Sequence, residues 1–439
     1  MANTRLSRTV GTPTLNTKYT LSFWLKRSKL SYSEPFVFDG RADASNRFKF
    51  AFQATDRIEC WNSHGGSNTF QILTNRTFKD VNSWYHFVLA VDTTQGTDTN
   101  RVKLYVNGVQ ETSLATNNSP SINEANNVFN ESGAGISVGA YYNNTYGFDG
   151  LLSHVHFCDG QQLAPTVFGS TDSTTGEWKI NTSPSFTLGN NGFTILKDGN
   201  TITDQSSNSN DFSLANGTLT KTEDCPSNVF CTFNPLLGLT GAVFFQGNTY
   251  FYRSSGGNNR TIPGTIGASS GKYYAEFKVG ALMYAGVLPI NGSDVEKTQI
   301  GTNNHLGQHS GGYSLGTGQN GAVTYNGGSL TASGYTWSGT EIIQIALDLD
   351  NSKVFIGKNN VWANSSNPEN NTGGYSIQSG LTYTFGCTNS NADTACNFGN
   401  GHFQSTAISS AGTNASGNGV FELNVPAGYT ALSTKGLNL

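Results

Sequence analysis

Charged side chains are scarce in this chain of 439 residues, in which Asp, Glu, Lys and Arg together make up 12%. Soluble proteins usually carry about 25%. The net charge is −4, and no run of Lys or Arg occurs. Because a chain without a basic patch has nothing with which to follow a phosphate backbone, we expect no nucleic-acid partner.

Long apolar runs are missing as well. No stretch approaches the ~18 consecutive apolar residues that a transmembrane helix needs, so we expect no membrane insertion. The opening sequence MANTRLSRTVGTPTLNTKYT lacks the apolar core of a signal peptide. We therefore expect synthesis in a cytoplasm and no export through the secretory route.

Cysteines are few and scattered, at positions 60, 158, 225, 231, 387 and 396. This spacing argues against a disulfide framework and fits separate thiols in a reducing compartment. Cys225 and Cys231 are close enough in sequence to pair across a loop. Their redox state stays open at this stage.

Helical periodicity is the last absence. The chain instead contains short alternating runs bounded by Gly, Asn and Asp, which are typical of strands and hairpins. In EIIQIALDLD (341–350), Ile343, Ile345 and Leu347 share one face. The opposite face is polar, so we predict a half-buried strand with that face in solvent. Such runs predict an all-β protein made of antiparallel sandwiches of the jelly-roll kind.

The turn signals divide the chain into three parts. We predict a first sandwich over residues 1–170 and a second sandwich with a C-terminal tail over 241–439. Residues 171–240 mix strand-like and loop-like sequence and are expected to form a short irregular connection that packs on the first sandwich. Pro226, Pro235 and the glycines that follow support the second boundary.

Three groups of motifs resemble known families. The first is TLSFWLKR, SWYHFVLAVDTTQ, RVKLYVNGVQ and FDGLLSHVHFCDGQQLAP, in that order. This series resembles the laminin-G-like, or concanavalin A-like, lectin/glucanase sandwich over about residues 15–170. The resemblance implies two antiparallel sheets in which the FDGLLSHVHF strand closes one sheet.

The second group is SSGKYYAEFKV, EIIQIALDLDNSKVFIGKNNVW, NPENNTGG and ACNFGNGHF. It resembles the SPRY domain, another concanavalin-like double sheet, over about residues 268–405. Ala275 stands where that family often has an aromatic residue, and Asn360 stands where Gly is common before the Trp. Neither departure disrupts the pattern.

The third group of motifs lies between the first two modules and at the C-terminal end of the chain. DQSSNSNDFS, TEDCPSNVFCTFNPL and the tail VFELNVPAGYTALSTKGLNL are similar to strings in virion structural proteins of marine tailed phages. Those proteins combine laminin-G-like and SPRY-like modules. The resemblance implies a place on a virion, which a sandwich fold by itself does not.

Motifs for catalysis are absent. A glycan-cleaving enzyme needs two carboxylates about 5–9.5 Å apart, and the Glu-x-Asp-x-x-Glu strand of the laminarinase-like enzymes does not occur. The GxSxG elbow and a Walker-type phosphate loop are missing too. Asp348 and Asp350 form the nearest carboxylate pair, which we interpret as a solvated strand end. We therefore predict that the protein is not an enzyme.

A row of three metal-ligand types stands out in FDGLLSHVHFCDG. His154, His156 and Cys158 alternate, and alternate residues of a strand share a face. Imidazole and thiolate groups bind zinc or copper. Val155 and Phe157 take the core-packing face, so the row is expected to face solvent or a sheet edge. With no fourth ligand nearby in sequence, we predict no metal here.

Calcium is the cofactor that the laminin-G-like resemblance leaves open. It requires several oxygen ligands from loops. Asp39 and Asp149 are the candidates, with Asp92 and Asp159 as further ones, although no Asp-x-Asp-x-Asp run occurs. Apart from calcium we expect no cofactor.

Candidate carbohydrate-binding residues lie in two short stretches. Sugar sites use exposed aromatic rings that stack on pyranose faces, beside polar groups that read hydroxyls. Tyr141, Tyr142 and Tyr146 in YYNNTY, and Trp61 in WNSH, have this chemistry. The alternative is that these rings anchor a loop or a protein interface, where Tyr and Trp are also enriched.

Taken together, these features favour a non-enzymatic bacteriophage virion structural protein, either a capsid decoration or knob or a tail appendage. Its partners would be other virion proteins, and it would form a homo-oligomer or occur in multiple copies on the particle. The alternative is a host-attachment adhesin at a tail-fibre tip that binds host cell-surface glycans. A polysaccharide-degrading enzyme is the third hypothesis, and the missing carboxylate motif argues against it.

Overall fold

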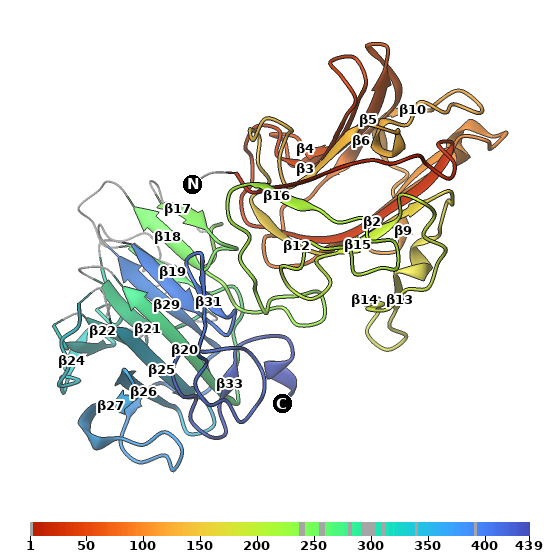
Figure 1. Cartoon of the computed structure of the whole chain (residues 1–439). Coiled ribbons are helices and arrows are strands. Elements are labelled where there is room, and N and C mark those ends of the chain that lie inside the picture. Colours follow the sequence, from red (N-terminus) through yellow and green to blue (C-terminus); the bar gives the residue numbers. More distant parts are fainter. Residues whose placement is uncertain are drawn as a thin grey trace. The chain divides into compact units, whose positions relative to one another are not determined.

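The chain forms two compact units, Met1–Leu219 and Thr220–Leu439, and each contains two large, almost wholly antiparallel sheets (Figure 1). This computed structural model describes residues 3–236, 242–253, 260–279, 283–290, 304–308, 313, 315–318, 320–338, 341–389 and 393–439. Over these ranges the only helices are short 3-10 turns, and none is long and apolar enough to cross a membrane. The predicted all-β class of antiparallel sandwiches is confirmed.

The unit boundary differs from the predicted division of the chain. Residues 171–219 belong to the first unit, where β15 (Phe193–Ile195) and β16 (Ser213–Asn216) extend its two sheets. The described residues from 220 to 236 belong to the second unit. The described part of the segment predicted as a connection over 171–240 is thus shared between the two units. Its strands β15 and β16 complete sheets of the first unit, because their partners β12 and β1 lie there.

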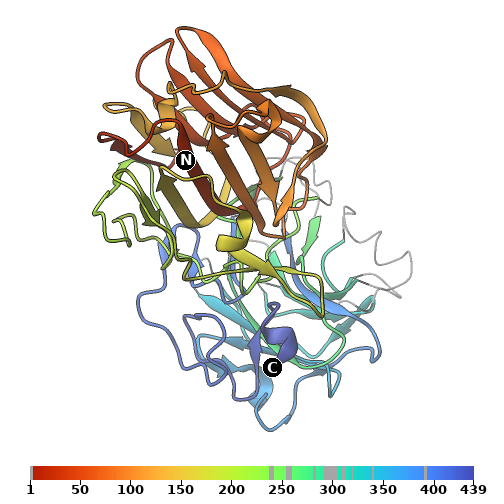
Figure 2. The same cartoon turned by 90° about the vertical axis from the view of Figure 1, so that its right-hand side faces the viewer.

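The first unit is a sandwich of an eight-stranded and a six-stranded sheet, with a small hairpin beside them. Figure 1 shows the two large sheets as separate layers, and Figure 2 shows red and orange strands of the larger sheet side by side. The larger sheet has the order β10 (Leu114–Asn118), β6 (Ser67–Thr77), β5 (Arg57–His64), β4 (Arg47–Phe52), β3 (Phe36–Arg41), β11 (Gly135–Val138), β1 (Arg5–Thr9) and β16. The smaller sheet has the order β15, β12 (Gly150–Asp159), β2 (Lys18–Arg27), β7 (Tyr85–Asp92), β8 (Val102–Val106) and β9 (Val109–Gln110). The hairpin is β13 (Gly169–Thr171) with β14 (Trp178–Ile180), and the 3-10 turns are η1 (Asp98–Asn100), η2 (Val128–Asn130) and η3 (Pro165–Val167).

Phenylalanine fills the space between these two sheets. In RFKFAF of β4, Phe48, Phe50 and Phe52 are fully buried in the core. Arg47 and Lys49 alternate with them and therefore lie on the outer face of the sheet. This alternation places both charged residues of β4 on that outer surface.

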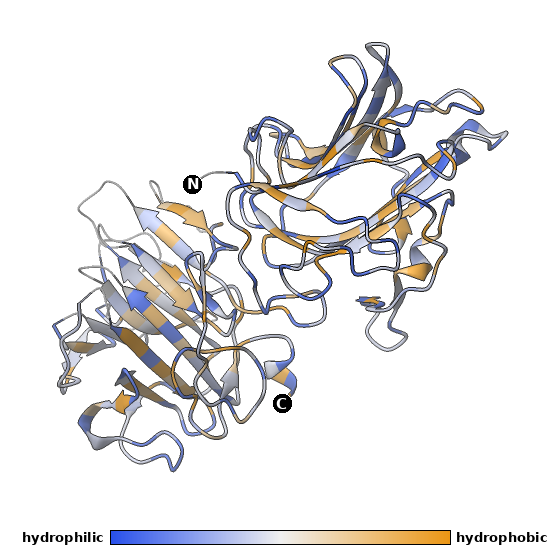
Figure 3. Ribbon diagram, viewed as in Figure 1, coloured by the Kyte–Doolittle hydropathy of each residue, from blue (hydrophilic) through white to orange (hydrophobic). Residues whose placement is uncertain are grey.

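The second unit repeats the two-sheet plan with a nine-stranded and a six-stranded sheet. The larger sheet has the order β17 (Ala242–Phe245), β18 (Tyr250–Arg253), β30 (Thr394–Asn397), β20 (Lys272–Val279), β25 (Ile342–Asp348), β26 (Lys353–Lys358) and β27 (Val361–Trp362), with β28 (Tyr375–Ser376) on β26 and β33 (Thr430–Ala431) parallel to β20. The smaller sheet has the order β19 (Arg260–Pro263), β29 (Tyr383–Asn389), β21 (Met283–Pro289), β22 (Leu315–Gly318), β23 (Val323–Tyr325) and β24 (Gly328–Leu330). A hairpin of β31 (His402–Phe403) and β32 (Thr406–Ala407) and the 3-10 turns η4 (Ala363–Ser365) and η5 (Gly436–Asn438) complete the unit. Figure 3 shows hydrophobic and hydrophilic residues alternating along several of these strands.

The predicted alternation in EIIQIALDLD is confirmed, but its solvent-facing side is wrong. Ile343, Ile345 and Leu347 pack between the sheets as expected. Ala346 on the opposite face is also fully buried. The C-terminal tail covers this face with a cluster of aromatic and apolar side chains, among them Phe421, Val425 and Tyr429. The larger sheet is therefore buried on both faces along β20 and β25.

A buried carboxylate fastens the tail to the sheet. Glu276 on β20 is fully buried and accepts hydrogen bonds from the backbone N–H groups of Leu423 at 2.7 Å and Glu422 at 3.0 Å. Tyr274 and Asn397 donate the remaining two side-chain bonds, at 3.2 Å and 3.1 Å. Burial raises the pKa of Glu276 to about 7, and these donors oppose the rise.

The tail also pairs with the start of the second unit. Cys231 N–H donates to the Leu432 carbonyl at 2.9 Å, and Thr434 N–H donates to the Val229 carbonyl at 2.9 Å. Phe230 packs in the same cluster as the tail aromatics. Two strings that are about 200 residues apart in sequence thus form one structural element. All six cysteines are free thiols, Cys225 and Cys231 included.

Removing a tail aromatic tests the importance of this cover. The ring of Phe421 lies 4.9 Å from that of Tyr274 and is almost fully buried. We expect Phe421→Ala to lower the free energy of unfolding by about 3 kcal/mol, because it leaves a cavity against the sheet. Urea unfolding measures the change. Val361→Ala, at a side chain that is 60% exposed, is the control and should change it by less than about 0.5 kcal/mol. Equal effects of the two substitutions would contradict the structural role of the tail.

Candidate functional site

The loop of residues 140–147 is held against the outer face of the larger sheet in the first unit. Tyr142 N–H donates to Asp39 Oδ2 on β3 at 3.0 Å. Phe36 N–H donates to the Tyr146 carbonyl at 2.8 Å, and Arg5 Nε donates to Asn144 Oδ1 at 2.7 Å. These bonds come from β1 and β3, so the loop has a defined position on the sheet.

The three predicted tyrosines of this loop form an aromatic cluster. The ring of Tyr141 lies 4.6 Å from that of Tyr142, 6.1 Å from that of Tyr146 and 5.0 Å from that of Phe36. Tyr142 is 41% exposed and Tyr146 is 48% exposed. The cluster therefore presents ring surface to solvent, where a pyranose face can stack.

Two arginines connect this cluster to Trp61. The Arg47 guanidinium lies 4.9 Å from the centre of the Tyr141 ring and 5.4 Å from that of Trp61. The Arg41 guanidinium lies 4.2 Å from the ring of Tyr142. Cations at these distances are attracted to aromatic faces.

The structure thus brings all four sequence-predicted sugar-binding residues into one place. We call this place the aromatic–arginine surface, and it consists of Tyr141, Tyr142, Tyr146, Trp61, Arg41 and Arg47. Sequence reasoning missed the two arginines. The signal that was available is the alternation of RFKF, which puts charge on the outer face of the strand next to the one that carries Trp61.

A buried carboxylate lies below this surface. Asp39 is 1% exposed, and its Oδ1 has no hydrogen-bond partner among the described residues. Burial raises the pKa of Asp39 to about 7, whereas Arg47, Arg41 and Arg5 act to lower it. These three cations around Asp39 oppose the binding of a calcium ion there.

The four candidate calcium aspartates are held in separate networks. Asp92 pairs with Lys18, and Asp159 accepts bonds from the backbone of Thr14. Burial raises the pKa of Asp149 to about 6. No group of three or more His, Cys, Asp or Glu side chains gathers in the described ranges. Calcium binding stays a prediction, and its ligands would include backbone carbonyl groups.

The row of His154, His156 and Cys158 has the predicted inner neighbours, since Val155 and Phe157 pack in the core. The expectation that the row faces solvent or a sheet edge is wrong. A segment of residues 160–187 covers His156 and Cys158, whereas His154 is buried at a β-bulge with a φ of +47°. The ring of His156 stacks on Phe168 at 5.7 Å and its Nδ1 bonds Thr194 Oγ1 at 2.9 Å. Cys158 Sγ contacts the Thr187 carbonyl at 3.1 Å.

A third histidine on this face was not predicted. His86 on β7 is fully buried between Trp24, at 4.8 Å, and Trp178, at 5.9 Å. Trp178 Nε1–H donates to His86 Nδ1 at 3.0 Å, so His86 Nε2 carries the proton and donates to Ser22 Oγ at 2.9 Å. Both ring nitrogens of His86 are thus used within the chain. Trp178 lies 92 residues from His86 in sequence, which is why alternation along one strand did not reveal this contact.

Asp348 and Asp350, which were predicted to form a solvated strand end, differ in their surroundings in the structure. Asp348 is fully buried and pairs with Lys272 at 3.1 Å. Asp350 accepts a hydrogen bond from Gly271 N–H at 2.7 Å. The interpretation of Asp348 as solvated is therefore wrong, because the tail closes over this end of the sheet.

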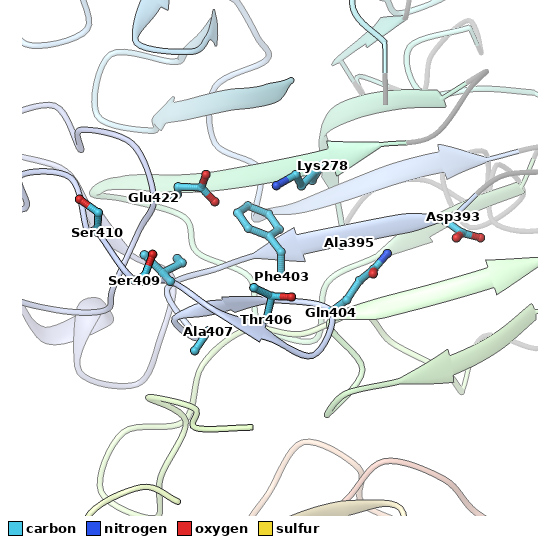
Figure 4. Close-up of a pocket in the computed structure, with 11 residues that line it drawn as sticks. Lys278, Asp393, Ala395, Phe403, Gln404, Thr406, Ala407, Ser409, Ser410 and Glu422 are labelled. Carbon is cyan, nitrogen blue, oxygen red and sulfur yellow. The ribbon is translucent and has the colours of Figure 1, made fainter. Parts of the chain in front are cut away.

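A hollow of about 500 Å³ lies in the second unit beside β20, β30 and the β31–β32 hairpin. Figure 4 shows Glu422 and Asp393 at opposite ends of it, with Phe403 between them. Lys278 Nζ lies 5.3 Å from the centre of the Phe403 ring. Both polar and apolar side chains line the rest, namely Gln404, Thr406, Ser409, Ser410, Ala395, Ala407 and Ile408.

Comparison with known proteins agrees with the fold of the first unit. Residues 5–167 match the family model of the concanavalin A-like lectin/glucanases superfamily, so this part of the chain is similar to that superfamily. None of the curated proteins compared with the chain matches it.

Solved structures resemble parts of the chain at low identity. The SPRY domain of human HERC1 is 16% identical with a TM-score of 0.27, over 37% of this chain and 96% of that chain. The heptameric SAP-like pentraxin of Limulus polyphemus is 14% identical with a TM-score of 0.26, over 37% and 72%. Domain 4 of AbnA, a GH43 extracellular arabinanase of Geobacillus stearothermophilus in complex with arabinotriose, is 20% identical with a TM-score of 0.25, over 34% and 63%.

The buried histidines predict a pH-dependent stability. Burial lowers the pKa of His86 and His156 to about 3 and that of His154 to about 4. In the unfolded chain a histidine has a pKa of about 6.5. The unfolded state therefore binds protons first as pH falls below 6.5, and each histidine costs about 1 kcal/mol of stability by pH 5.5. Asp39 and Asp149, whose pKa values are raised, act in the opposite direction.

Comparing wild type with His156→Leu isolates one histidine from these opposing groups. We expect the stability of wild type relative to His156→Leu to fall by about 1 kcal/mol between pH 7.5 and pH 5.5. Urea unfolding at both pH values measures it. A difference that is the same at the two pH values would show that His156 does not stay neutral in the folded protein.

Proposed function

We propose that the protein is a non-enzymatic structural protein of a bacteriophage virion, either a capsid decoration or knob or a tail appendage. The observation that supports it is the pairing of the join with the tail. TEDCPSNVFCTFNPL and VFELNVPAGYTALSTKGLNL resemble strings of marine tailed-phage virion proteins, and here they meet through Cys231 and Leu432. A resemblance in two distant strings that form one structural element supports a shared module.

On this proposal the partners are other virion proteins, and the chain forms a homo-oligomer or occurs in multiple copies on the particle. Synthesis takes place in the host cytoplasm, and the final location is the virion. Because the chain has few charged residues, we expect its amide, hydroxyl and aromatic groups to make the contacts with these partners. We expect no contact with nucleic acid and no insertion into a membrane.

Purified particles test the virion role. We expect peptides of this protein in mass spectra of phage particles banded by density, at a constant ratio to the major capsid protein. Treatment with nuclease and a high-salt wash is the control for loosely adhering host proteins. Absence of the protein from intact particles that were produced by infected cells expressing it would refute the proposal.

Recognition of host cell-surface glycans is the second function that we propose, and the aromatic–arginine surface favours it. This surface combines exposed rings with polar groups on a fixed loop. Such an arrangement suits saccharides, which present both an apolar ring face and hydroxyl groups. On this proposal the first unit aids host attachment, as an adhesin at a fibre tip or on a head decoration.

A single tyrosine tests glycan recognition. We expect Tyr142→Ala to weaken binding to glycan arrays or to host envelope polysaccharide about tenfold, because it removes a stacking ring. Tyr252→Ala is the matched control, since Tyr252 lies in the second unit and is 40% exposed, close to the 41% of Tyr142. Binding that both variants retain in full would contradict a role for this loop.

The same assay tests the calcium prediction. Calcium is included in the buffer and is then removed with a chelator.

A further inference from the structure

We propose that the aromatic–arginine surface binds an acidic saccharide, through a carboxylate or sulfate ester group on the sugar. This inference rests on the proposed glycan recognition and adds the charge of the ligand to it. Three observations support it: two arginines without an ion pair to a carboxylate, the position of these arginines directly opposite each other, and rings placed beside them.

The two arginines stand in an unfavourable position without a ligand. Arg41 on β3 and Arg47 on β4 are directly opposite each other in the antiparallel register. Like charges opposite each other across a strand pair destabilise a sheet. Within the described part of the chain, neither guanidinium lies in an ion pair with a carboxylate. An anion bound between them would relieve this repulsion.

The described carboxylates around this surface leave both guanidinium groups without an ion pair. Lys49, the next cation on β4, pairs with Glu59 at 2.7 Å and with Glu34 at 3.4 Å. The carboxylates of Asp39 and Asp43 interact with the arginines over longer distances, Asp39 from a buried position. The charge around the surface is therefore balanced overall, and the specific feature is the pair of guanidinium groups that no carboxylate of the described residues contacts directly.

The stacked geometry leaves the arginines ready to bind an oxyanion. Arg47 lies beside the rings of Tyr141 and Trp61. Stacking uses the face of a guanidinium plane and leaves N–H groups at its edge. The fork of a guanidinium matches two oxygens of a carboxylate or a sulfate. Arg41 lies on the ring of Tyr142, and its Nη1 donates a hydrogen bond to Tyr141 Oη at 3.4 Å, so its other N–H groups would contact a ligand.

The exposed tyrosine rings provide contacts for a sugar that a simple inorganic anion would not use. Tyr142, whose ring lies beside Arg41, is 41% exposed, and Tyr146, whose ring lies beside Tyr141, is 48% exposed. A neutral sugar would contact mainly these rings, and an inorganic anion would contact mainly the guanidinium groups. A sugar that carries an oxyanion contacts both. Because the loop is already held by Asp39 and Arg5, little ordering is needed on binding.

Paired polymers that differ only in charge test the proposal with the full chain. The probes are dextran sulfate against dextran, and polygalacturonate against its methyl ester, with inorganic sulfate alone as a further probe. We expect the protein to bind at least one charged polymer about tenfold more tightly than its uncharged counterpart. The preference should shrink as salt rises. A preference for dextran sulfate over dextran would indicate a sulfate ester, and a preference for polygalacturonate over its methyl ester would indicate a carboxylate.

Charge-removing variants locate the site. We expect Arg47→Gln and Arg41→Gln each to lose about tenfold in affinity for the preferred charged polymer. Arg76→Gln is the matched control and should bind as wild type does. The guanidinium of Arg76 also lies over an aromatic ring, 5.1 Å from the centre of Phe78. Arg76 is outside the aromatic–arginine surface, because it lies on β6 five residues beyond Gln71, which is the residue opposite Trp61. Arg47→Lys keeps the charge and loses the fork, so it should fall between wild type and Arg47→Gln.

The outcomes separate this proposal from glycan recognition itself. Equal binding of charged and uncharged polymers, or full binding by Arg41→Gln and Arg47→Gln, would overturn the acidic ligand and leave glycan recognition standing. If inorganic sulfate bound as tightly as the charged polymers, the surface would be a simple anion site, and the proposal of an acidic saccharide would be overturned too. Failure of every polymer and every arrayed glycan to bind would overturn both. Melting temperatures of the variants show whether a loss reflects unfolding, and Arg47→Lys decides the case if Arg47→Gln is unstable.

Discussion

Burial of the outer face of a sheet by irregular chain is the constraint on which both units depend. A β-sandwich has one core between its sheets, and an outer face that carries apolar groups needs a further layer. Residues 160–187 supply this layer over β7 and β12 in the first unit. The C-terminal tail supplies it over β20 and β25 in the second unit. Neither sheet could keep its aromatic outer residues in solvent without cost.

Each covering segment is fastened by a buried polar group whose partners come from the cover. In the first unit, His86 receives its bond from Trp178 of the covering segment. In the second unit, Glu276 receives two bonds from the backbone of the tail. A polar group buried without such partners would cost a few kcal/mol, so sheet and cover depend on each other. The histidine and glutamate side chains that look chemically reactive in the sequence therefore have a structural use.

Strand identity and core faces could be predicted from the sequence because both depend on alternation over a few residues. Ile343 and Val155 were placed correctly on this basis. The covers could not be predicted in this way, because they contact the sheets across long separations. Phe168 and Phe421 lie outside the strands, and Trp178 begins β14 of the small hairpin. Aromatic residues outside the two large sheets are the signal that a sheet has a third layer.

The same reasoning explains why the tyrosines of the candidate site were predicted and the arginines were not. Tyr141, Tyr142 and Tyr146 occur in one short stretch, whereas Arg47 lies 94 residues before Tyr141 in the chain. Only the register of β3, β4 and β5 brings Arg41, Arg47 and Trp61 to one side. Sequence reasoning therefore recognised a ring platform but not the charge beside it.

The conformation of Tyr146 keeps its ring at the surface of the loop. Its φ is +52°, a left-handed conformation that is unfavourable for a residue with a Cβ. Such strain costs about 1–3 kcal/mol and persists where the surrounding structure holds it. Here the Phe36 N–H bond to the Tyr146 carbonyl holds it, and the ring remains 48% exposed. On the proposed function, this ring and the neighbouring ring of Tyr141, on which Arg47 lies, form a fixed platform for a sugar.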